Sequence, residues 1–193
     1  MAQFSVTKQK IKYTIRELVH QLTSLTNDFD ETWFESQNGI GWSPKDITEH
    51  IYLVNQYVIS KVNYTRELIL EGFVNNAIEY EESDLQIVDI MLAISIYRIE
   101  TPEDFTKSLC FSFEEIKIKL VHQIHIISNL VNDLPEEMIA NYKEHSKFIS
   151  GIKLDLYQLI YLSVIHGNHH MMQIATLKEI KKSLNKQEVL YSY

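Results

Sequence analysis

The chain has 193 residues, 45% of them hydrophobic, with only five glycines and three prolines. This length suits one domain, residues 1–193, with a substantial core, and so few turn-forming residues argue against a turn-rich all-β fold. The formal net charge of −8 excludes a generic nucleic-acid surface, because neutralising phosphates requires clustered Lys and Arg.

The first predicted helix covers residues 5–28. His20 falls off its hydrophobic stripe and is expected at the surface; the stripe consists of Ile11, Ile15, Leu18, Leu22 and Leu25. The start of this helix is polar and lacks the hydrophobic core of a signal peptide. No apolar run in the chain approaches the ~18 residues of a membrane span, so no membrane partner is expected.

Ser43, Pro44 and Asp46 mark the start of the second predicted helix, after a turn-forming stretch at residues 37–41. Ser43 suits the N-cap, Pro44 suits the first helical position, and the Asp46 carboxylate can reach back to the cap. His50 lies at the edge of the buried stripe, where it is either a boundary residue or a ligand that reaches the bundle interior. That stripe consists of Ile47, Ile51, Val54, Val58 and Val62.

Residues 71–111 form a long and irregular connection. Within it, residues 87–99 are apolar enough for a short helix or a packed segment, and residues 101–105 predict a turn or a one-turn helix capped by Thr101. A connection of this length usually has its own packing or acts as a lid. Cys110 is the single cysteine and is expected to be a packed thiol; it excludes an internal disulfide, which fits a reducing cytoplasm.

The third predicted helix begins at a Ser112 cap, with a near match to a capping box, and ends at Pro135. Its stripe consists of Phe113, Ile116, Leu120, Ile124, Ile127, Val131 and Leu134. His122 and His125 lie three residues apart and are a possible metal pair, but both fall off the stripe and are expected on the flank or surface of the helix.

A polar connection over residues 136–151, which contains His145, leads to the fourth predicted helix, residues 153–182. Four long amphipathic helices, with no strand pattern that competes, predict an all-α four-helix bundle with a long connection between the second and third helices.

The seam of the fourth helix is polar in its middle. Its spacings alternate between three and four residues, and it consists of Leu156, Leu159, Ser163, His166, His170, Gln173 and Leu177. Burying such polar groups without partners costs about 1–3 kcal/mol each. His166 and His170 can aim both imidazoles at one point, as helical His pairs of zinc enzymes do, or they are core histidines bonded to carbonyls or waters. Gln173 either supports a ligand or is satisfied on its own, and His169 is expected to be flanking or exposed.

In such a bundle the second and fourth helices could bring three imidazoles together with an open position, as in catalytic metal sites; these are His50, His166 and His170. The surrounding segments resemble those of DinB-like (DinB/YfiT) proteins. Residues 42–50, WSPKDITEH, are similar to the W-S-x-x-[DE]-x-x-x-H segment of that family. Residues 166–174, HGNHHMMQI, are similar to its H-x-x-x-H-x-x-Q-I segment, and residues 98–105 look like a connection common in the family.

The resemblance extends over about residues 5–180 and implies a four-helix bundle with a divalent metal, usually zinc or nickel, bound by His50, His166 and His170. It also implies a homodimer, and an activity as a metal-dependent hydrolase or as an S-transferase that uses a low-molecular-weight thiol. Met171-Met172 stands where many members carry Arg followed by Gly or Ala, so this chain lacks a basic rim residue for an anionic substrate.

The leading hypothesis is therefore a metal-dependent enzyme that acts on a small-molecule substrate or thiol. The sequence identifies no catalytic side chain: Glu49 is the carboxylate nearest in sequence to a ligand, but it lies about 100° around the helix from His50. A second hypothesis is a stress-response module that binds a metal or small ligand without turnover. A third is a structural dimerisation domain, which predicts that His50→Leu and His170→Leu are tolerated.

Overall fold

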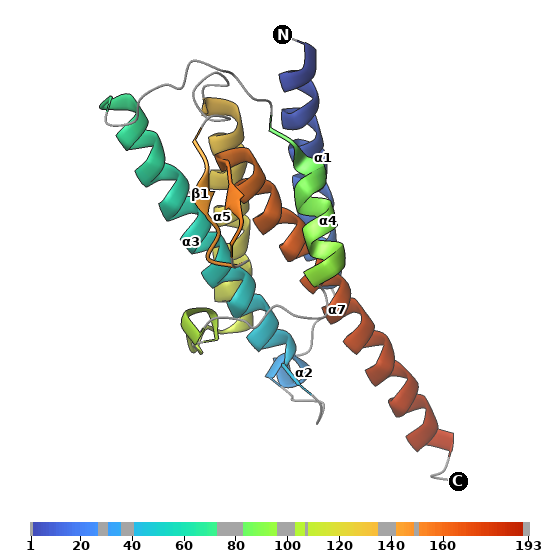
Figure 1. Cartoon of the computed structure of the whole chain (residues 1–193). Helices are drawn as coiled ribbons and strands as arrows, with labels where there is room; N and C mark the ends of the chain where they lie inside the picture. Colours follow the sequence, from blue (N-terminus) through green and yellow to red (C-terminus); the bar gives the residue numbers. More distant parts are fainter. Residues whose placement is uncertain are drawn as a thin grey trace.

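Four long helices pack side by side in the structure, a computed structural model that describes residues 2–26, 31–35, 41–72, 83–95, 103–106, 108–134, 142–148 and 151–190. These helices are α1 (Ala2–Thr26), α3 (Pro44–Leu70), α5 (Phe113–Asp133) and α7 (Leu156–Leu190). Each packs mainly against two neighbours in the cyclic order α1, α7, α3, α5 (Figure 1). The described chain is thus the all-α bundle that the sequence predicted.

The core lies where the predicted stripes meet. Each long helix contributes a side chain with no exposed surface, namely Ile11, Val58, Val131 and Ile160. The stripes predicted for α3 and α5 are buried throughout, as is that of α1 up to Leu22, whereas the side chain of Leu25 lies outside the described residues. Hydrophobic spacing alone therefore identified the inward faces of these three helices.

The direction of the helices explains the long connection. In Figure 1, α1 and α7 run one way along the bundle, while α3 and its neighbour α5 run the other way. A chain that joins two parallel neighbours must return along the bundle, and helix α4 (Leu85–Ser95) covers that distance while it contacts α7. The one-turn helix η1 (Glu103–Phe105) follows, at the position predicted for a turn. The predicted Thr101 cap and most of the turn at residues 37–41 lie outside the described residues.

Side-chain caps fix where the long helices begin. Ser43 Oγ accepts from the Asp46 main-chain N–H at 3.1 Å, and Asp46 Oδ2 accepts from the Ser43 N–H at 2.8 Å, as the sequence predicted. Ser112 and Glu115 form the same reciprocal pair before α5, so the near match was a complete capping box. Helix α7 begins after Asp155 rather than at residue 153.

Two short elements were not predicted. Helix α2 (Glu31–Glu35) lies between α1 and α3, and a two-stranded antiparallel sheet pairs β1 (Glu144–His145) with β2 (Lys153–Leu154). The expected polar connection over residues 136–151 thus contains part of a hairpin, and residues expected in the fourth helix form its second strand. Strands of two residues are too short to produce a recognisable alternation of polar and apolar side chains.

Helix α7 extends beyond the start of α3, so its last turns lie outside the bundle (Figure 1). Where it crosses α1, Gly167 is buried, and a Cβ atom there would lie 3.1 Å from Leu18 Cδ2. Among the described residues, no helix is long and apolar enough to cross a membrane.

Candidate metal centre

Three histidines from two helices converge between α3 and α7. His50, on the second turn of α3, is 4% exposed, and His166 and His170 lie one turn apart in the middle of α7. The Nε2 atom of His166 lies 3.2 Å from His50 Nε2 and 3.0 Å from His170 Nε2. One ring nitrogen from each of the three residues lies within 4.8 Å of the others, a spacing that could hold a metal ion. The structure thus brings together the three residues that the sequence singled out.

Hydrogen bonds on the outer side of two rings determine which nitrogen carries the proton. His50 Nδ1 lies 3.0 Å from the main-chain carbonyl of Phe105, and His170 Nδ1 lies 2.7 Å from Gln173 Oε1. Both partners are acceptors, so each Nδ1 is the donor and, in the neutral ring, each Nε2 keeps its lone pair. Outer contacts of this kind typically orient metal-binding histidines.

The donor set fits a cation. The lone pairs of His50 and His170 both face Nε2 of His166, and a single N–H on that atom can fully satisfy only one of them. Nδ1 of His166 is buried without a hydrogen-bond partner among the described residues, so it can carry the ring proton and leave a third lone pair at the same point. Three neutral imidazoles that share one point are a ligand set suited to zinc, nickel, iron or cobalt.

Burial keeps the three rings neutral. It lowers the pKa of His50, although the hydrogen bond to Phe105 opposes the shift, and it lowers the pKa of His170 to about 4, against the bond to Gln173. Burial, followed by repulsion from the neighbouring histidines, lowers the pKa of His166 well below its usual value. The unprotonated form, which is the form that binds metals, therefore predominates near neutral pH.

A cavity of about 240 Å³ opens beside His50. It is lined by His50 together with Trp42, Asp46, Glu49, Phe105, Thr106 and Ser108. The Trp42 ring packs edge-on against His50 at a centroid distance of 4.9 Å and is stacked 6.4 Å from His170. Trp42 therefore packs against the histidine cluster and also lines a cavity that is large enough for a small molecule.

Glu49 lines this cavity but holds the main chain of the neighbouring connection. Its carboxylate accepts from the N–H of Leu109 at 3.0 Å and from the N–H of Phe111 at 3.2 Å. Between them, Cys110 has a φ of 56° and an exposed side chain, so the prediction of a packed thiol was wrong. The two bonds to Glu49 fix the main chain on both sides, and the thiol is left on the outside of the turn.

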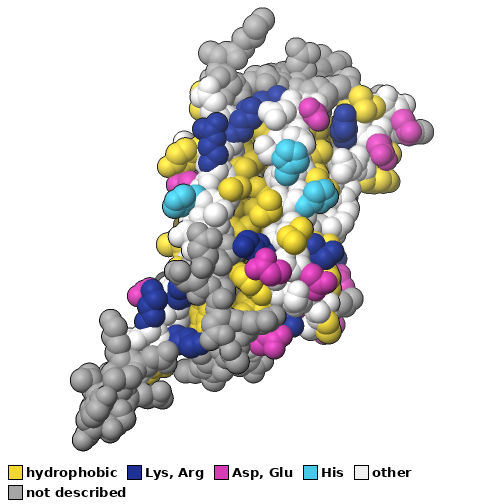
Figure 2. Space-filling view, turned by 180° about the vertical axis from the view of Figure 1, so that it is seen from behind, with side chains coloured by type: hydrophobic (Ala, Val, Ile, Leu, Met, Phe, Trp, Pro, Cys, Tyr) yellow, Lys and Arg dark blue, Asp and Glu magenta, His cyan; other side chains and the backbone are white. Residues whose placement is uncertain are grey.

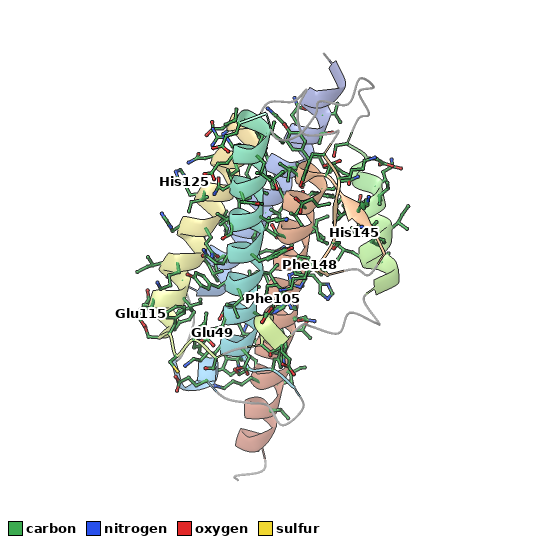
Figure 3. The ribbon with its side chains drawn as sticks, turned by 60° about the vertical axis from the view of Figure 1, so that its left-hand side comes forward. Glu49, Phe105, Glu115, His125, His145 and Phe148 are labelled. Carbon is green, nitrogen blue, oxygen red and sulfur yellow. The ribbon has the colours of Figure 1, made fainter. Side chains whose placement is uncertain are left out.

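Four of the remaining histidines are not part of the cluster, whereas the ring of His169 lies beside it, 6.0 Å from the ring of His170. His20, His122, His125, His145 and His169 are all exposed, as expected for His20, His122, His125 and His169. Exposed histidine side chains are visible on the face opposite to that of Figure 1, among hydrophobic side chains and charges of both signs (Figure 2). His125 and His145 lie on opposite sides of the molecule (Figure 3).

Sequence reasoning left open or missed three contributors to the site. Gln173 is exposed, and its Oε1 atom accepts from Nδ1 of His170 on the same face of α7. Trp42 and the carbonyl of Phe105 had no assigned role. The position of Trp42 next to the Ser43 cap was a usable signal, whereas a main-chain carbonyl from a distant connection leaves none.

Comparisons with known proteins identify the family of the chain. The family model described as the DinB superfamily matches residues 11–174, a range that includes His50, His166 and His170. Searches of curated proteins and of solved structures found no match. The match covers most of the chain, and the described fold is a helical bundle. The chain therefore belongs to the DinB superfamily.

Proposed function

We propose that the protein is a metal-dependent enzyme that holds one divalent transition-metal ion, zinc or nickel, on His50, His166 and His170. The observation that carries the proposal is the convergence of one ring nitrogen from each of three histidines within 4.8 Å, with the Nδ1 atoms of His50 and His170 donating outward. When bound, such an ion would supply Lewis acidity, to activate water for hydrolysis or a low-molecular-weight thiol for transfer.

The surrounding residues bind, orient and shield. Phe105 and Gln173 hold the rings of His50 and His170 in the orientation that binding a shared metal ion requires. Trp42, which is 38% exposed, packs its indole ring against His50 and so limits access of water to the cluster from that side. The substrate would enter the cavity beside His50.

The composition of the cavity favours a substrate that is not strongly anionic. Its described lining contains two carboxylates, two hydroxyl groups and two aromatic rings besides His50, and none of these residues is cationic. On α7, Met171 is buried and Met172 is exposed, so neither places a positive charge at the rim of the cluster. A neutral thiol or a small neutral ester or amide fits this lining better than a phosphate.

A second candidate function is binding of a metal or small ligand without turnover. It is favoured by the engagement of both carboxylates in the cavity: Asp46 is bonded to Ser43, and Glu49 is bonded to the main chain at Leu109 and Phe111. Neither is available as a general base unless these bonds break, so an enzyme here would depend on the metal and the substrate for its proton transfers.

The test compares zinc-loaded, nickel-loaded and metal-stripped protein in hydrolysis assays and in thiol-transfer assays with several low-molecular-weight thiols. We expect activity that requires the metal and is lost in His166→Ala, with His125→Ala as a control because His125 is exposed on α5. Metal binding without any metal-dependent activity would favour the binding module. If His50→Leu and His170→Leu leave stability unchanged or raise it, and no metal binds, the structural alternative is correct.

A further inference from the structure

The hydrogen bond that orients His50 comes from a very small element. Phe105 is the last residue of the three-residue helix η1. The main-chain carbonyl of Phe105 accepts a hydrogen bond from Nδ1 of His50, which lies 55 residues earlier in the chain. Within this turn, Thr106 contributes its N–H and its hydroxyl to the carbonyl of Glu103, at 3.1 and 2.9 Å. A single turn cannot fix its own position against α3, so tertiary contacts must place the carbonyl.

Those contacts are aromatic. The ring of Phe105 is 4% exposed and lies 5.3 Å from Phe148 and 5.8 Å from Tyr57, and the rings of Tyr57 and Phe148 are 5.4 Å apart. We call these three side chains the aromatic clamp. Figure 3 shows Phe105 and Phe148 next to one another beside α3. Tyr57 belongs to α3, two turns after His50, so the clamp joins η1 to the helix that carries the ligand.

A charged pair covers the same cluster. Lys147 Nζ lies 2.7 Å from Asp104 Oδ2, and it lies over the rings of Tyr57 and Phe105 at 5.6 and 5.4 Å from their centroids. Both charged groups are largely exposed, so the ion pair itself contributes little. The ion pair nevertheless joins the hairpin to η1, because Lys147 precedes Phe148 and Asp104 precedes Phe105 in the chain.

Phe148 is itself held by the hairpin. Strands β1 and β2 pair on either side of it, the Ser146 N–H donates to the Ile152 carbonyl at 2.7 Å, and the Phe148 N–H donates to Ser146 Oγ at 3.2 Å. The second strand leads directly into α7, which carries His166 and His170. The hairpin therefore contacts Phe105, which orients the candidate ligand His50. It also leads into α7, which carries the candidate ligands His166 and His170.

We propose that Phe148 is a positioning residue of the metal centre: through the aromatic clamp it holds the Phe105 carbonyl against His50 Nδ1 and so directs His50 Nε2 to the shared point. The inference rests on the proposed metal site, but it makes a separate claim about the metal-free protein, in which the clamp selects the tautomer of His50. Loss of an outer hydrogen bond of this kind typically weakens metal binding about 10–100-fold.

The experiment uses the full chain with Phe148→Leu, which removes the ring but keeps a hydrophobic side chain, and Phe148→Tyr, which keeps the ring. The matched control is Phe34→Leu, because Phe34 is 1% exposed and forms its own aromatic pair with Phe113 at 4.9 Å. Three quantities are measured: the imidazole nitrogen signals of His50 in metal-free protein by NMR, Zn²⁺ affinity by competition with a chelator, and thermal unfolding. Tyr57→Leu provides the same test if Phe148→Leu does not fold.

We expect Phe148→Leu to weaken Zn²⁺ binding at least about 10-fold and to abolish the preference of His50 for the Nδ1–H tautomer, with both restored in Phe148→Tyr. Phe34→Leu should lower the melting temperature without either change. Unchanged tautomer and affinity in Phe148→Leu, or an equal loss of affinity in Phe34→Leu, would overturn the proposal. If wild-type protein binds no Zn²⁺, the proposed function fails, and the NMR signals still decide whether the clamp positions His50.

Discussion

The Asp155 side chain caps a helix from a buried position, and its contribution to the free energy of unfolding depends on pH. It is 1% exposed and caps α7: its Oδ1 accepts from the Gln158 N–H at 2.8 Å and from the Ser83 hydroxyl at 3.0 Å. Its Oδ2 is buried with no hydrogen-bond partner among the described residues. Burial raises the pKa of Asp155 from 3.8 to about 6, although these hydrogen bonds oppose the shift.

The raised pKa determines the sign of a pH effect on stability. The folded state binds the proton more tightly than the unfolded state, so this contribution is fully present below about pH 4 and is lost as the pH rises through 6. Relative to Asp155→Asn, the free energy of unfolding of the wild type should therefore fall by up to about 3 kcal/mol over this range. Urea unfolding of metal-free proteins at several pH values measures it. A difference between the two proteins that is independent of pH would contradict this account.

At the scale of elements, α7 is closely fitted to α1 at Gly167. An added Cβ would lie 3.1 and 3.3 Å from the two methyl groups of Leu18, closer than the usual carbon contact, and Leu18 is 2% exposed. Alanine favours a helix by about 1 kcal/mol over glycine, but overpacking typically costs about 1–3 kcal/mol. The crowding should therefore outweigh the gain in helix propensity.

A double-mutant cycle tests this balance in metal-free protein. We expect Gly167→Ala alone to lower the free energy of unfolding by about 1 kcal/mol, and the same change in a Leu18→Val background to raise it. Chemical denaturation of the four proteins gives the coupling between the two positions. Additive effects would show that Leu18 does not determine the need for glycine.

The predictability of the elements follows from their length. Helices α1, α3 and α5 bury stripes that repeat over several turns, and Ser43 and Ser112 mark two of their starts. Helix α2 and the β1–β2 hairpin are too short to show a period, and Asp155 was overlooked as the cap of α7 because the preceding residues had been assigned to that helix. The polar middle of the α7 seam was informative because it interrupts an otherwise apolar pattern.

At the scale of the whole molecule, the candidate site depends on how distant segments meet. Helical spacing showed that His50, His166 and His170 lie at or beside inward stripes and could converge, and the resemblance to DinB-like proteins favoured a shared site over boundary or core histidines. The contacts that orient these histidines come from residues distant in the sequence. The carbonyl of Phe105 bonds to His50, and the ring of Phe105 packs against Phe148, a hairpin residue more than 40 positions later in the chain. No local sequence pattern predicts this contact, because it depends on how the connection that contains η1 and the connection that contains the hairpin pass over the bundle.

The most direct test of the metal site is elemental analysis of the protein, purified without chelators or nickel affinity resin, beside His50→Ala, His170→Ala and His125→Ala. Three neutral imidazoles at one point predict about one zinc or nickel ion per chain, lost in the first two variants and kept in the third. Absence of metal from the wild type, even after Zn²⁺ or Ni²⁺ is added, would contradict the assignment. The cluster would then be three buried histidines that serve only the packing of α3 against α7.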